Sequence, residues 1–311
     1  MYAGGSTNRA NTAGLIGRHM RALKATSRMF TLALLAVYLG TAGCTAPRPP
    51  QEQNPQGQQP EQKQAAQSQQ ASDQDDEVKM GEEVFNQLKA KGEIVESSPL
   101  YDELKPIADG ITRAAQPRYN HPFKFYLVHE KQPNAFATPG GNVYVVDSLL
   151  YFVKNKEQLA GTLCHEVAHT IHHDTMELME KQQKLEKREL GAAVLMGPTR
   201  AHLLAIALIG KLHSLGYSRD AEQRADLTGS DICAGTGSNP WGLIWLFQDF
   251  QSANPDQLPQ LLSDHPADQN RITALKRHFK QNPSVFGQFS SDQKTATPMS
   301  VPKDAPEVFL R

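Results

Sequence analysis

The segment HEVAH, residues 165–169, constrains the fold of this chain more than any other feature. Its surroundings predict a helix with Asn155 as the N-cap. The apolar residues of this helix recur at every fourth position: Leu159, Leu163, Val167 and Ile171. Side chains at positions i and i+4 share one face of a helix, so His165 and His169 can bind one metal ion. Glu166 lies beside that ion and can take a proton from a water molecule there, which predicts a catalytic zinc site.

Catalytic zinc binds three protein ligands and keeps one position open, so the two histidines need a third partner. A pattern with a third histidine six residues after the second one fails, because Thr175 occupies that position. A second pattern takes a glutamate from a later helix, and Glu222 lies in a helix that we predict over residues 218–234. Asp226 shares its face and can accept the N–H of a ligand histidine. Taken alone, these acidic residues also fit a solvated helix face.

The residues before the metal-binding helix predict a small β-sheet. Phe123–Val128 alternates in polarity, and Asn134–Ala137 and Asn142–Val146 form two short strands joined by a turn at Pro139–Gly141. We expect Asn142–Val146 to be an edge strand, whose free N–H and C=O groups pair with an extended peptide substrate. Its substrate-binding residues are then Asn142, Val143, Tyr144 and Val145. An interior strand with covered edges is the alternative.

Helices account for most of the remaining pattern. We predict them over residues 77–95 and 99–115, and after Pro240 and Pro266. The metal-binding helix is expected to continue through residues 177–189. The apolar stretch 191–216 is interrupted by polar residues, so it predicts a packed helical hairpin or a mobile flap and no membrane span. The whole indicates an α+β fold that is dominated by helices and contains a small mixed β-sheet.

The N-terminal region has the layout of an export signal. Basic residues precede a short apolar run, residues 30–39, and small residues follow it. The run is too short to cross a bilayer as a stable helix. The signal fits best if translation starts at Met20. We therefore expect residues 1–19 to be a wrongly assigned start and residues 20–43 to be a lipoprotein signal peptide.

Cys44 follows the small residues directly and resembles the lipobox cysteine of bacterial lipoproteins. Lipid modification would make it the mature N-terminus, although Thr41 stands where leucine is usual. Ordinary cleavage or an uncleaved anchor are the alternatives. Residues 44–77 are rich in Gln and Pro and cannot bury enough apolar surface to fold, which favours a disordered tether. Thr45 is not the aspartate associated with inner-membrane retention, so the outer membrane is favoured.

We expect one zinc metallopeptidase domain over residues 78–286, followed by a flexible tail over residues 287–311. A net charge of −1 gives no electrostatic footprint for nucleic acid, which is not expected as a partner. With Cys44 set aside, the three cysteines do not suggest a disulfide framework. Cys164 and Cys233 are interpreted as small buried core residues.

Four segments of the chain together resemble a known family. They are Asn134–Gly141, HEVAH at 165–169, YSRDAEQRAD at 217–226, and Asp264–Pro266 with Arg271. In this order they are similar to the HtpX and CAAX-prenyl-protease type of gluzincin metallopeptidase, in its periplasmic BepA, LoiP and Oma-like branch. The resemblance covers about residues 78–280. It implies a zincin-like fold with one Zn²⁺ ion per chain.

The resemblance also implies roles for the site residues. His165, His169 and Glu222 correspond to the zinc ligands, and Asp226 corresponds to the partner that hydrogen-bonds behind them.

His265 and Arg271 join Glu166 as candidate catalytic residues in this resemblance. It implies that His265 lies near the metal, where it occupies the open position or stabilises the reacting carbonyl group. Arg271 would help to hold or polarise the site. The chain departs from its relatives at His173 and Asp174, where an Arg-His pair is usual, and these two residues are interpreted as part of a solvated helix face.

These expectations lead to one main function and two alternatives. The chain is expected to be a zinc-dependent endopeptidase of the bacterial cell envelope that hydrolyses misfolded or misassembled envelope proteins. It would face the periplasm as an outer-membrane lipoprotein held by a lipid on Cys44. One alternative is a chaperone-like assembly factor for outer-membrane proteins, with a largely silent zinc site capped by His265. A weaker one is a metal-dependent hydrolase of another bond, such as one in the cell wall. The oligomeric state does not follow from the sequence.

Overall fold

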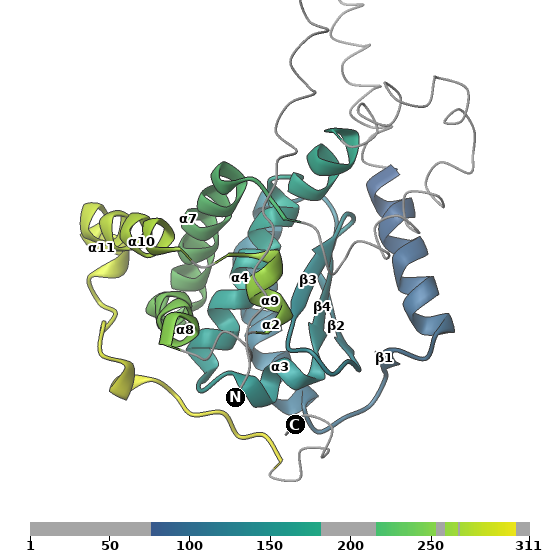
Figure 1. Ribbon diagram of the computed structural model, residues 1–311, viewed down its shortest axis with the longest axis horizontal. Coiled ribbons are helices and arrows are strands. Elements are labelled where there is room, and N and C mark those ends of the chain that lie inside the picture. Colours follow the sequence, from purple (N-terminus) through teal and green to yellow (C-terminus); the bar gives the residue numbers. More distant parts are fainter. Residues whose placement is uncertain (1–75, 182–215, 253–258, 267, 303–311) are drawn as a thin grey trace, which may run out of the picture. The chain divides into compact units, whose positions relative to one another are not determined.

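The computed structural model describes residues 76–181, 216–252, 259–266 and 268–302, and Figure 1 shows how their helices and strands are arranged. One sheet has four strands in the order β1-β2-β4-β3. The strands are β1 (Ile94–Val95), β2 (Lys124–Val128), β3 (Ala135–Thr138) and β4 (Asn142–Val146). The pair β2–β4 is parallel and the other two pairs are antiparallel, so the sheet is small and mixed, which confirms the prediction.

Strand β4 lies inside the sheet and not at its edge. It pairs with β2 on one side and with β3 on the other, and Val143 is opposite both Phe125 and Ala137. The expectation of a substrate-binding edge strand is therefore wrong for Asn142, Val143, Tyr144 and Val145, because the two ladders use the backbone groups of this strand. All five residues of β4 are buried. A strand that is buried on both faces reads as a continuous apolar run, which is the character of VYVV.

Both faces of the sheet are covered by apolar side chains. On one face, Val143 and Val145 belong to the main core, which also includes residues of α2 (Tyr101–Ala115), α4 (Lys156–Ile171) and α8 (Trp241–Ser252). On the other face, Tyr144 packs in a smaller cluster with Met80, Val84 and Leu88. These three residues come from a helix over residues 76–90, which ends before the predicted residue 95 because β1 follows it.

Helix α4 is the central helix of the domain. Its N-cap is Asn155, whose side chain accepts a hydrogen bond from the N–H of Gln158 at 2.9 Å, as the capping pattern predicted. Every residue from Gln158 to Thr170 is buried, since α4 packs against the sheet and against α2, α7 (Arg219–Thr236) and α8. The HEVAH segment therefore lies in the interior, where polar side chains need partners.

The predicted continuation of α4 through residues 177–189 is wrong for the part of that segment within the described residues. The helix ends at Ile171, and His173 adopts the left-handed conformation with a φ of 55°. A separate helix then covers residues 174–181. A non-glycine residue in the left-handed region interrupts an α-helix, so the chain changes direction directly after the HEVAH segment.

The described helices after residue 215 begin and end close to the predicted residues. Helix α7 has Ser218 as its N-cap and ends before Gly237, whose φ of 84° is left-handed. Helix α10 (Gln269–Gln281) starts after the N-cap Asp268, later than the predicted start at Pro266. It buries Ile272, Leu275 and Phe279, as predicted. The other short elements are α3 (Asp147–Phe152), η1 (Gln116–Arg118), α9 (Gln260–Asp264), α11 (Pro283–Phe286) and η3 (Gln293–Thr295).

Residues beyond 286, predicted to begin a flexible tail, contact the domain. The indole N–H of Trp245 donates to the carbonyl of Ser291 at 3.1 Å. The N–H of Lys156 donates to the carbonyl of Thr297 at 2.9 Å. The domain boundary at residue 286 stays a prediction.

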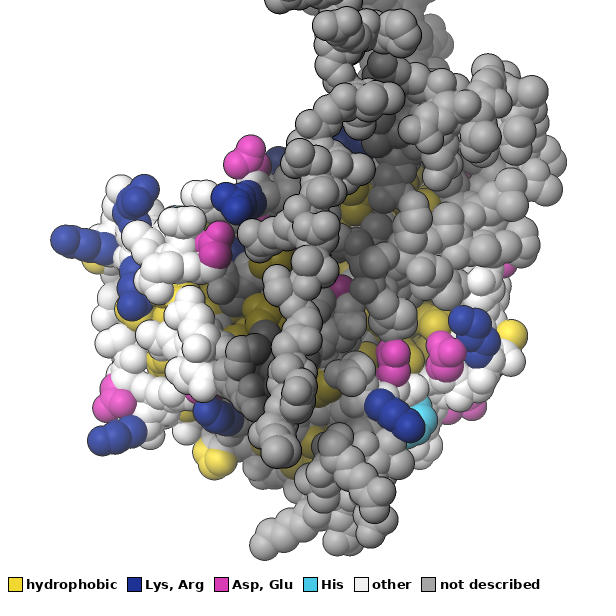
Figure 2. All heavy atoms as spheres, viewed as in Figure 1, with side chains coloured by type: hydrophobic (Ala, Val, Ile, Leu, Met, Phe, Trp, Pro, Cys, Tyr) yellow, Lys and Arg dark blue, Asp and Glu magenta, His cyan; other side chains and the backbone are white. Residues whose placement is uncertain are grey.

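The surface mixes charges of both signs. On the face that Figure 2 shows, Lys and Arg side chains and Asp and Glu side chains are both present, and hydrophobic side chains lie between them. None of the described helices is long and apolar enough to cross a lipid bilayer. The predictions for the signal peptide, for Cys44, for residues 44–75 of the tether and for residues 191–215 lie outside the described residues. Residues 76 and 77, predicted to end the tether, belong to the helix over residues 76–90.

Candidate active site

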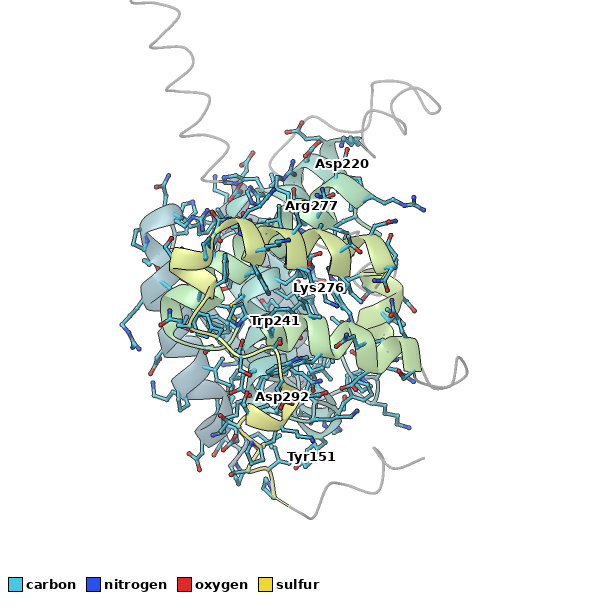
Figure 3. All side chains as sticks on the ribbon, turned by 90° about the vertical axis from the view of Figure 1, so that its left-hand side faces the viewer. Tyr151, Asp220, Trp241, Lys276, Arg277 and Asp292 are labelled. Atoms are coloured by element: carbon cyan, nitrogen blue, oxygen red, sulfur yellow. The ribbon has the colours of Figure 1, made fainter. Side chains whose placement is uncertain are left out.

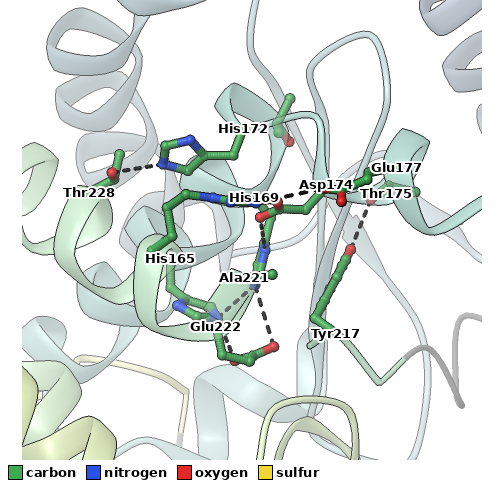
Figure 4. Close-up of polar contacts among 12 residues, drawn as sticks. His165, His169, His172, Asp174, Thr175, Glu177, Tyr217, Ala221, Glu222 and Thr228 are labelled. Atoms are coloured by element: carbon green, nitrogen blue, oxygen red, sulfur yellow. Dashed lines mark hydrogen bonds and ion pairs between the residues drawn. The ribbon is translucent and has the colours of Figure 1, made fainter. Parts of the chain in front are cut away.

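Helices α4 and α7 bring three predicted metal ligands together (Figure 4). The Nε2 atoms of His165 and His169 lie 3.0 Å apart. The carboxylate of Glu222 lies 3.4 Å from Nε2 of His165 and 3.6 Å from Nε2 of His169. His265 follows α9 and adds a fourth group, because its Nδ1 lies 2.9 Å from Glu222 and 3.2 Å from His165. All four side chains are buried.

These four groups have the spacing of ligands around one metal ion. Their donor atoms all lie within 4.8 Å of one another. Tetrahedral bonds of about 2.0–2.1 Å place neighbouring ligand atoms about 3.3–3.4 Å apart. The contacts above, which run from 2.9 to 3.6 Å, scatter around that separation. Imidazole nitrogens with one carboxylate also suit a divalent transition metal, so the residues present fit a metal site.

The second ring nitrogen of each HEVAH histidine faces a buried aspartate. Nδ1 of His165 lies 3.0 Å from Oδ1 of Asp226. Nδ1 of His169 lies 2.8 Å from Oδ2 of Asp174. An N–H on Nδ1 that points at a carboxylate fixes the ring and leaves the Nε2 lone pair for a metal. Asp226 therefore lies where the sequence analysis expects a partner of a ligand histidine.

Asp174 differs from the expectation of a solvated residue. It is 2% exposed, and its other oxygen pairs with the guanidinium group of Arg224 on α7. Half of the His173 side chain is exposed, and its Nδ1 contacts Glu77 at 2.5 Å. The left-handed turn at His173 directs Asp174 back to His169, and a continuous helix would carry it to another face. The sequence shows only an acidic residue five positions after His169. Its contact with that histidine cannot be predicted unless the end of the helix is known.

Replacement of Asp174 by asparagine is expected to weaken metal binding by about 10–100-fold. The amide keeps the shape of the side chain but removes the charge that holds the Nδ1 proton of His169. The metal dissociation constant is measured by competition with a coloured chelator. Glu177→Gln is the matched control, because Glu177 also faces Arg224, at 3.8 Å, but is half exposed. An equal loss in both variants would mean that the charge near Arg224 matters and the contact with His169 does not.

Arg271, from α10, is buried between two carboxylates of the site. Its Nε and Nη2 donate to Asp226 at 2.7 and 2.6 Å, and its Nη1 lies 2.8 Å from Glu222. The guanidinium carbon lies 4.4 Å from the centre of the Phe247 ring. All three guanidinium nitrogens are thus engaged with groups of the protein, and the planar group stacks on an aromatic face. This geometry fits a residue that positions Glu222 and Asp226.

Comparison with known proteins places this site in a family. The family model for peptidase family M48 matches residues 100–278, which contain α4, α7 and His265. The chain belongs to peptidase family M48. This assignment agrees with the metallopeptidase resemblance found in the sequence, and the helix-dominated fold with its small mixed sheet is the predicted zincin-like one.

Curated proteins similar to this M48 chain include bacterial proteases and a mitochondrial metalloendopeptidase. The beta-barrel assembly-enhancing protease of Yersinia pestis is 26% identical over 249 residues, which are 72% of this chain and 51% of the relative. The protein of the same name from Escherichia coli (strain K12) is 24% identical over 226 residues, 70% of this chain and 46% of the relative. The mitochondrial metalloendopeptidase OMA1 of Saccharomyces cerevisiae is 28% identical over 162 residues, 50% of this chain and 46% of the relative. The chain thus spans about half the length of these relatives.

Burial and hydrogen bonding drive the pKa values of the two HEVAH histidines of the M48 domain apart. Burial acts to lower the pKa of His165, but hydrogen bonds to Asp226 and Glu222 outweigh it and raise the pKa to about 9. Burial and the charge of His165 lower the pKa of His169 to about 3. Burial alone would raise the pKa of Glu222, but the nearby His265 and His165 hold that pKa well below its usual range. The site therefore keeps an anionic carboxylate among imidazoles and attracts positive charge to one point.

Glu166 is the one carboxylate of the HEVAH segment, and it is 1% exposed. Its Oε1 lies 3.3 Å from Nε2 of His265 and accepts no hydrogen bond from the described residues. Burial raises the pKa of Glu166 above its usual value, although the charges of His265 and His165 oppose this. A carboxylate with a raised pKa is a better proton acceptor near neutral pH, which is the property that a general base needs.

Tyr217 is a site residue that the sequence analysis did not single out. Its ring stacks on His169 with centroids 4.1 Å apart and lies 5.6 Å from the ring of His265. Its hydroxyl contacts Oγ1 of Thr175 at 2.8 Å (Figure 4). Tyr217 opens the YSRDAEQRAD segment, but a single aromatic residue before an N-cap has no distinctive pattern in a sequence.

Proposed function

We propose that this M48 chain is a zinc-dependent endopeptidase of the bacterial cell envelope. The observation that supports it most is the convergence of His165, His169 and Glu222 beside the buried carboxylate of Glu166. We propose Zn²⁺ as the metal because imidazole and carboxylate ligands in tetrahedral spacing suit it. The substrates would be misfolded or misassembled envelope proteins, in line with the relatives named beta-barrel assembly-enhancing protease.

The location is proposed from the N-terminal sequence. The predicted signal peptide at residues 20–43 would export the chain, and a lipid on Cys44 would hold it at the outer membrane, facing the periplasm. Residues 44–75 would then separate the domain from the membrane surface.

The proposed chemistry divides the work among the buried side chains. When bound, the zinc ion supplies a Lewis acid that polarises a water molecule and a peptide carbonyl group. Glu166 accepts the proton of the attacking water and later passes it to the leaving amine. His265, whose Nε2 lies 3.3 Å from Glu166, is placed to donate to the carbonyl oxygen as negative charge develops there. Arg271 holds Glu222 and Asp226 in place throughout.

We propose that substrate binds along β3. Among the described strands, none pairs with the outer side of β3, and α4 packs against this strand. An extended peptide can add to such an edge through main-chain hydrogen bonds. The side-chain amide of Asn134, directly before β3, donates to Asp264 at 2.9 Å. This bond ties the proposed substrate edge to the residue before His265.

One observation favours the chaperone-like alternative. Nδ1 of His265 lies among the other donor atoms, 2.9 Å from Glu222, where the fourth metal position would be. A histidine that occupies this position excludes the attacking water, so the resting peptidase would be slow and a holding activity would dominate.

The test uses an unfolded outer-membrane β-barrel protein and the same protein folded in detergent. The full chain is expected to cleave the unfolded substrate, with new N-termini identified by mass spectrometry, and to spare the folded one. A chelator is expected to stop cleavage, and Zn²⁺ is expected to restore it. The proposal is wrong if cleavage survives complete metal removal. If neither the wild type nor His265→Ala cleaves, and both prevent aggregation of the substrate, the chaperone-like function is correct.

A further inference from the structure

Two buried cysteines lie side by side behind the metal site. The Sγ atoms of Cys164 on α4 and Cys233 on α7 are 2.9 Å apart, and both side chains are at most 1% exposed. The two sulfur atoms would have to move only roughly 0.9 Å closer to reach the length of an S–S bond, about 2.05 Å. The sequence analysis interpreted both as core residues and could not see that they meet, because they are 69 positions apart.

The contact follows from how closely the two helices pack. A Cβ atom added at Gly229 of α7 would lie 3.0 Å from the backbone carbonyl group of Cys164, so glycine permits this approach without a shift of the neighbouring backbone. Gly229 and Cys233 are four residues apart and share one face of α7. Glu222 lies on nearly the same face, since eleven residues correspond to about three helical turns. The face of α7 that carries the metal ligand therefore also carries the second thiol.

We propose that Cys164 and Cys233 form an intramolecular disulfide that joins the two metal-binding helices. The bond would connect the residue directly before His165 to α7, at a point about 16 Å along the helix from Glu222. It would hold α4 and α7 together whether or not a metal is bound. The oxidising compartment that it requires rests on the envelope location proposed above.

The reaction joins the two sulfur atoms and removes two protons and two electrons from the thiols. The electrons pass to a disulfide oxidant, such as the disulfide of a thiol oxidoreductase or glutathione disulfide, which is reduced to two thiols. One thiolate of the chain first attacks this oxidant to give a mixed disulfide. The second thiol of the chain then displaces the oxidant's sulfur.

Burial determines when the bond can form and why it would last. Both thiols are at most 1% exposed in the folded domain, so a disulfide oxidant can reach them only before α4 and α7 have docked. Once the helices are packed, small reductants have no access to the sulfur atoms.

The experiment refolds the full chain in a glutathione redox buffer and alkylates free thiols under denaturing conditions before peptide mass analysis. The expected result is one linked pair of peptides, containing Cys164 and Cys233, that is about 2 Da lighter than the reduced pair. Protein that is refolded in the presence of reductant is expected to melt about 10 °C lower than the oxidised protein. Protein isolated from a bacterial periplasm should carry the same link.

The double variant Cys164→Ala/Cys233→Ala separates the bond from simple packing. Its melting temperature is expected to be the same with and without reductant, whereas that of the wild type falls. If both thiols of protein refolded in the oxidising buffer are alkylated under the denaturing conditions, the proposal is overturned, and so it is by a link that involves Cys44. Cleavage of the unfolded β-barrel protein is measured on the same samples. Free thiols with cleavage reject the disulfide alone, and a disulfide without cleavage rejects the proposed peptidase alone.

Discussion

Replacement of Glu166 by glutamine is expected to reduce peptide cleavage by about 10²–10⁴-fold while metal binding persists. The amide has the size of the carboxylate but cannot accept a proton. Glu166 is buried and contacts His265 at 3.3 Å, so the substitution leaves the packing intact. Cleavage of the unfolded substrate gives the rate, and bound metal is measured by mass spectrometry of the native protein.

The control for this prediction is Glu157→Gln, on the first turn of the same helix. Glu157 contacts Thr297 and lies eight residues before His165, about two helical turns from the HEVAH segment. This variant is expected to keep the wild-type rate. A Glu166→Gln protein that cleaves as fast as wild type would remove Glu166 from the mechanism. A variant that has lost its metal would instead show that Glu166 supports the metal site.

Replacement of Arg271 by methionine is expected to lower the free energy of unfolding by about 3–5 kcal/mol. The variant leaves Asp226 and Glu222 buried beside one another without the cation that neutralises them. Methionine keeps apolar contact with Phe247, so the loss reports mainly on the charge. Urea denaturation of metal-free protein measures it, because a bound metal would partly replace the missing charge.

Arg277→Met on the same helix is the control, and Figure 3 shows Arg277 and Lys276 on the outer side of α10. An exposed residue of this kind is expected to change stability by less than about 0.5 kcal/mol. A second variant, Arg271→Met with Asp226→Asn, should recover part of the lost stability, because it removes one of the two buried carboxylate charges that Arg271 neutralises. If Arg271→Met unfolds at the same urea concentration as the wild type, Arg271 is not what stabilises these carboxylates.

The parts of the fold that local sequence could predict are those with their own start and stop signals. Asn155 and Ser218 cap α4 and α7 as predicted, because a side chain that accepts a backbone N–H needs only a few neighbouring residues. The prediction that Glu222 converges on the histidines came from the family resemblance, because the spacing alone does not indicate that two distant helices pack together.

The errors arose where the answer depends on residues far away in the chain. The position of β4 in the sheet depends on β2 and β3 pairing on either side of it, and an apolar strand reads alike at an edge or inside. Asp174 reaches His169 only because His173 takes a left-handed conformation, which no helical periodicity predicts. The contact of Cys164 with Cys233 depends on the packing of two helices around Gly229.

The hydrogen bond between Thr175 and Tyr217 has a consequence for the geometry of the site. It joins two residues that are 42 positions apart, and Tyr217 stacks on His169, whose aspartate partner directly precedes Thr175. The helix end behind the HEVAH segment and the residue before α7 are thus fastened to each other beside the chelating groups. Tyr217 therefore limits how far the imidazole of His169 can tilt away from Glu222.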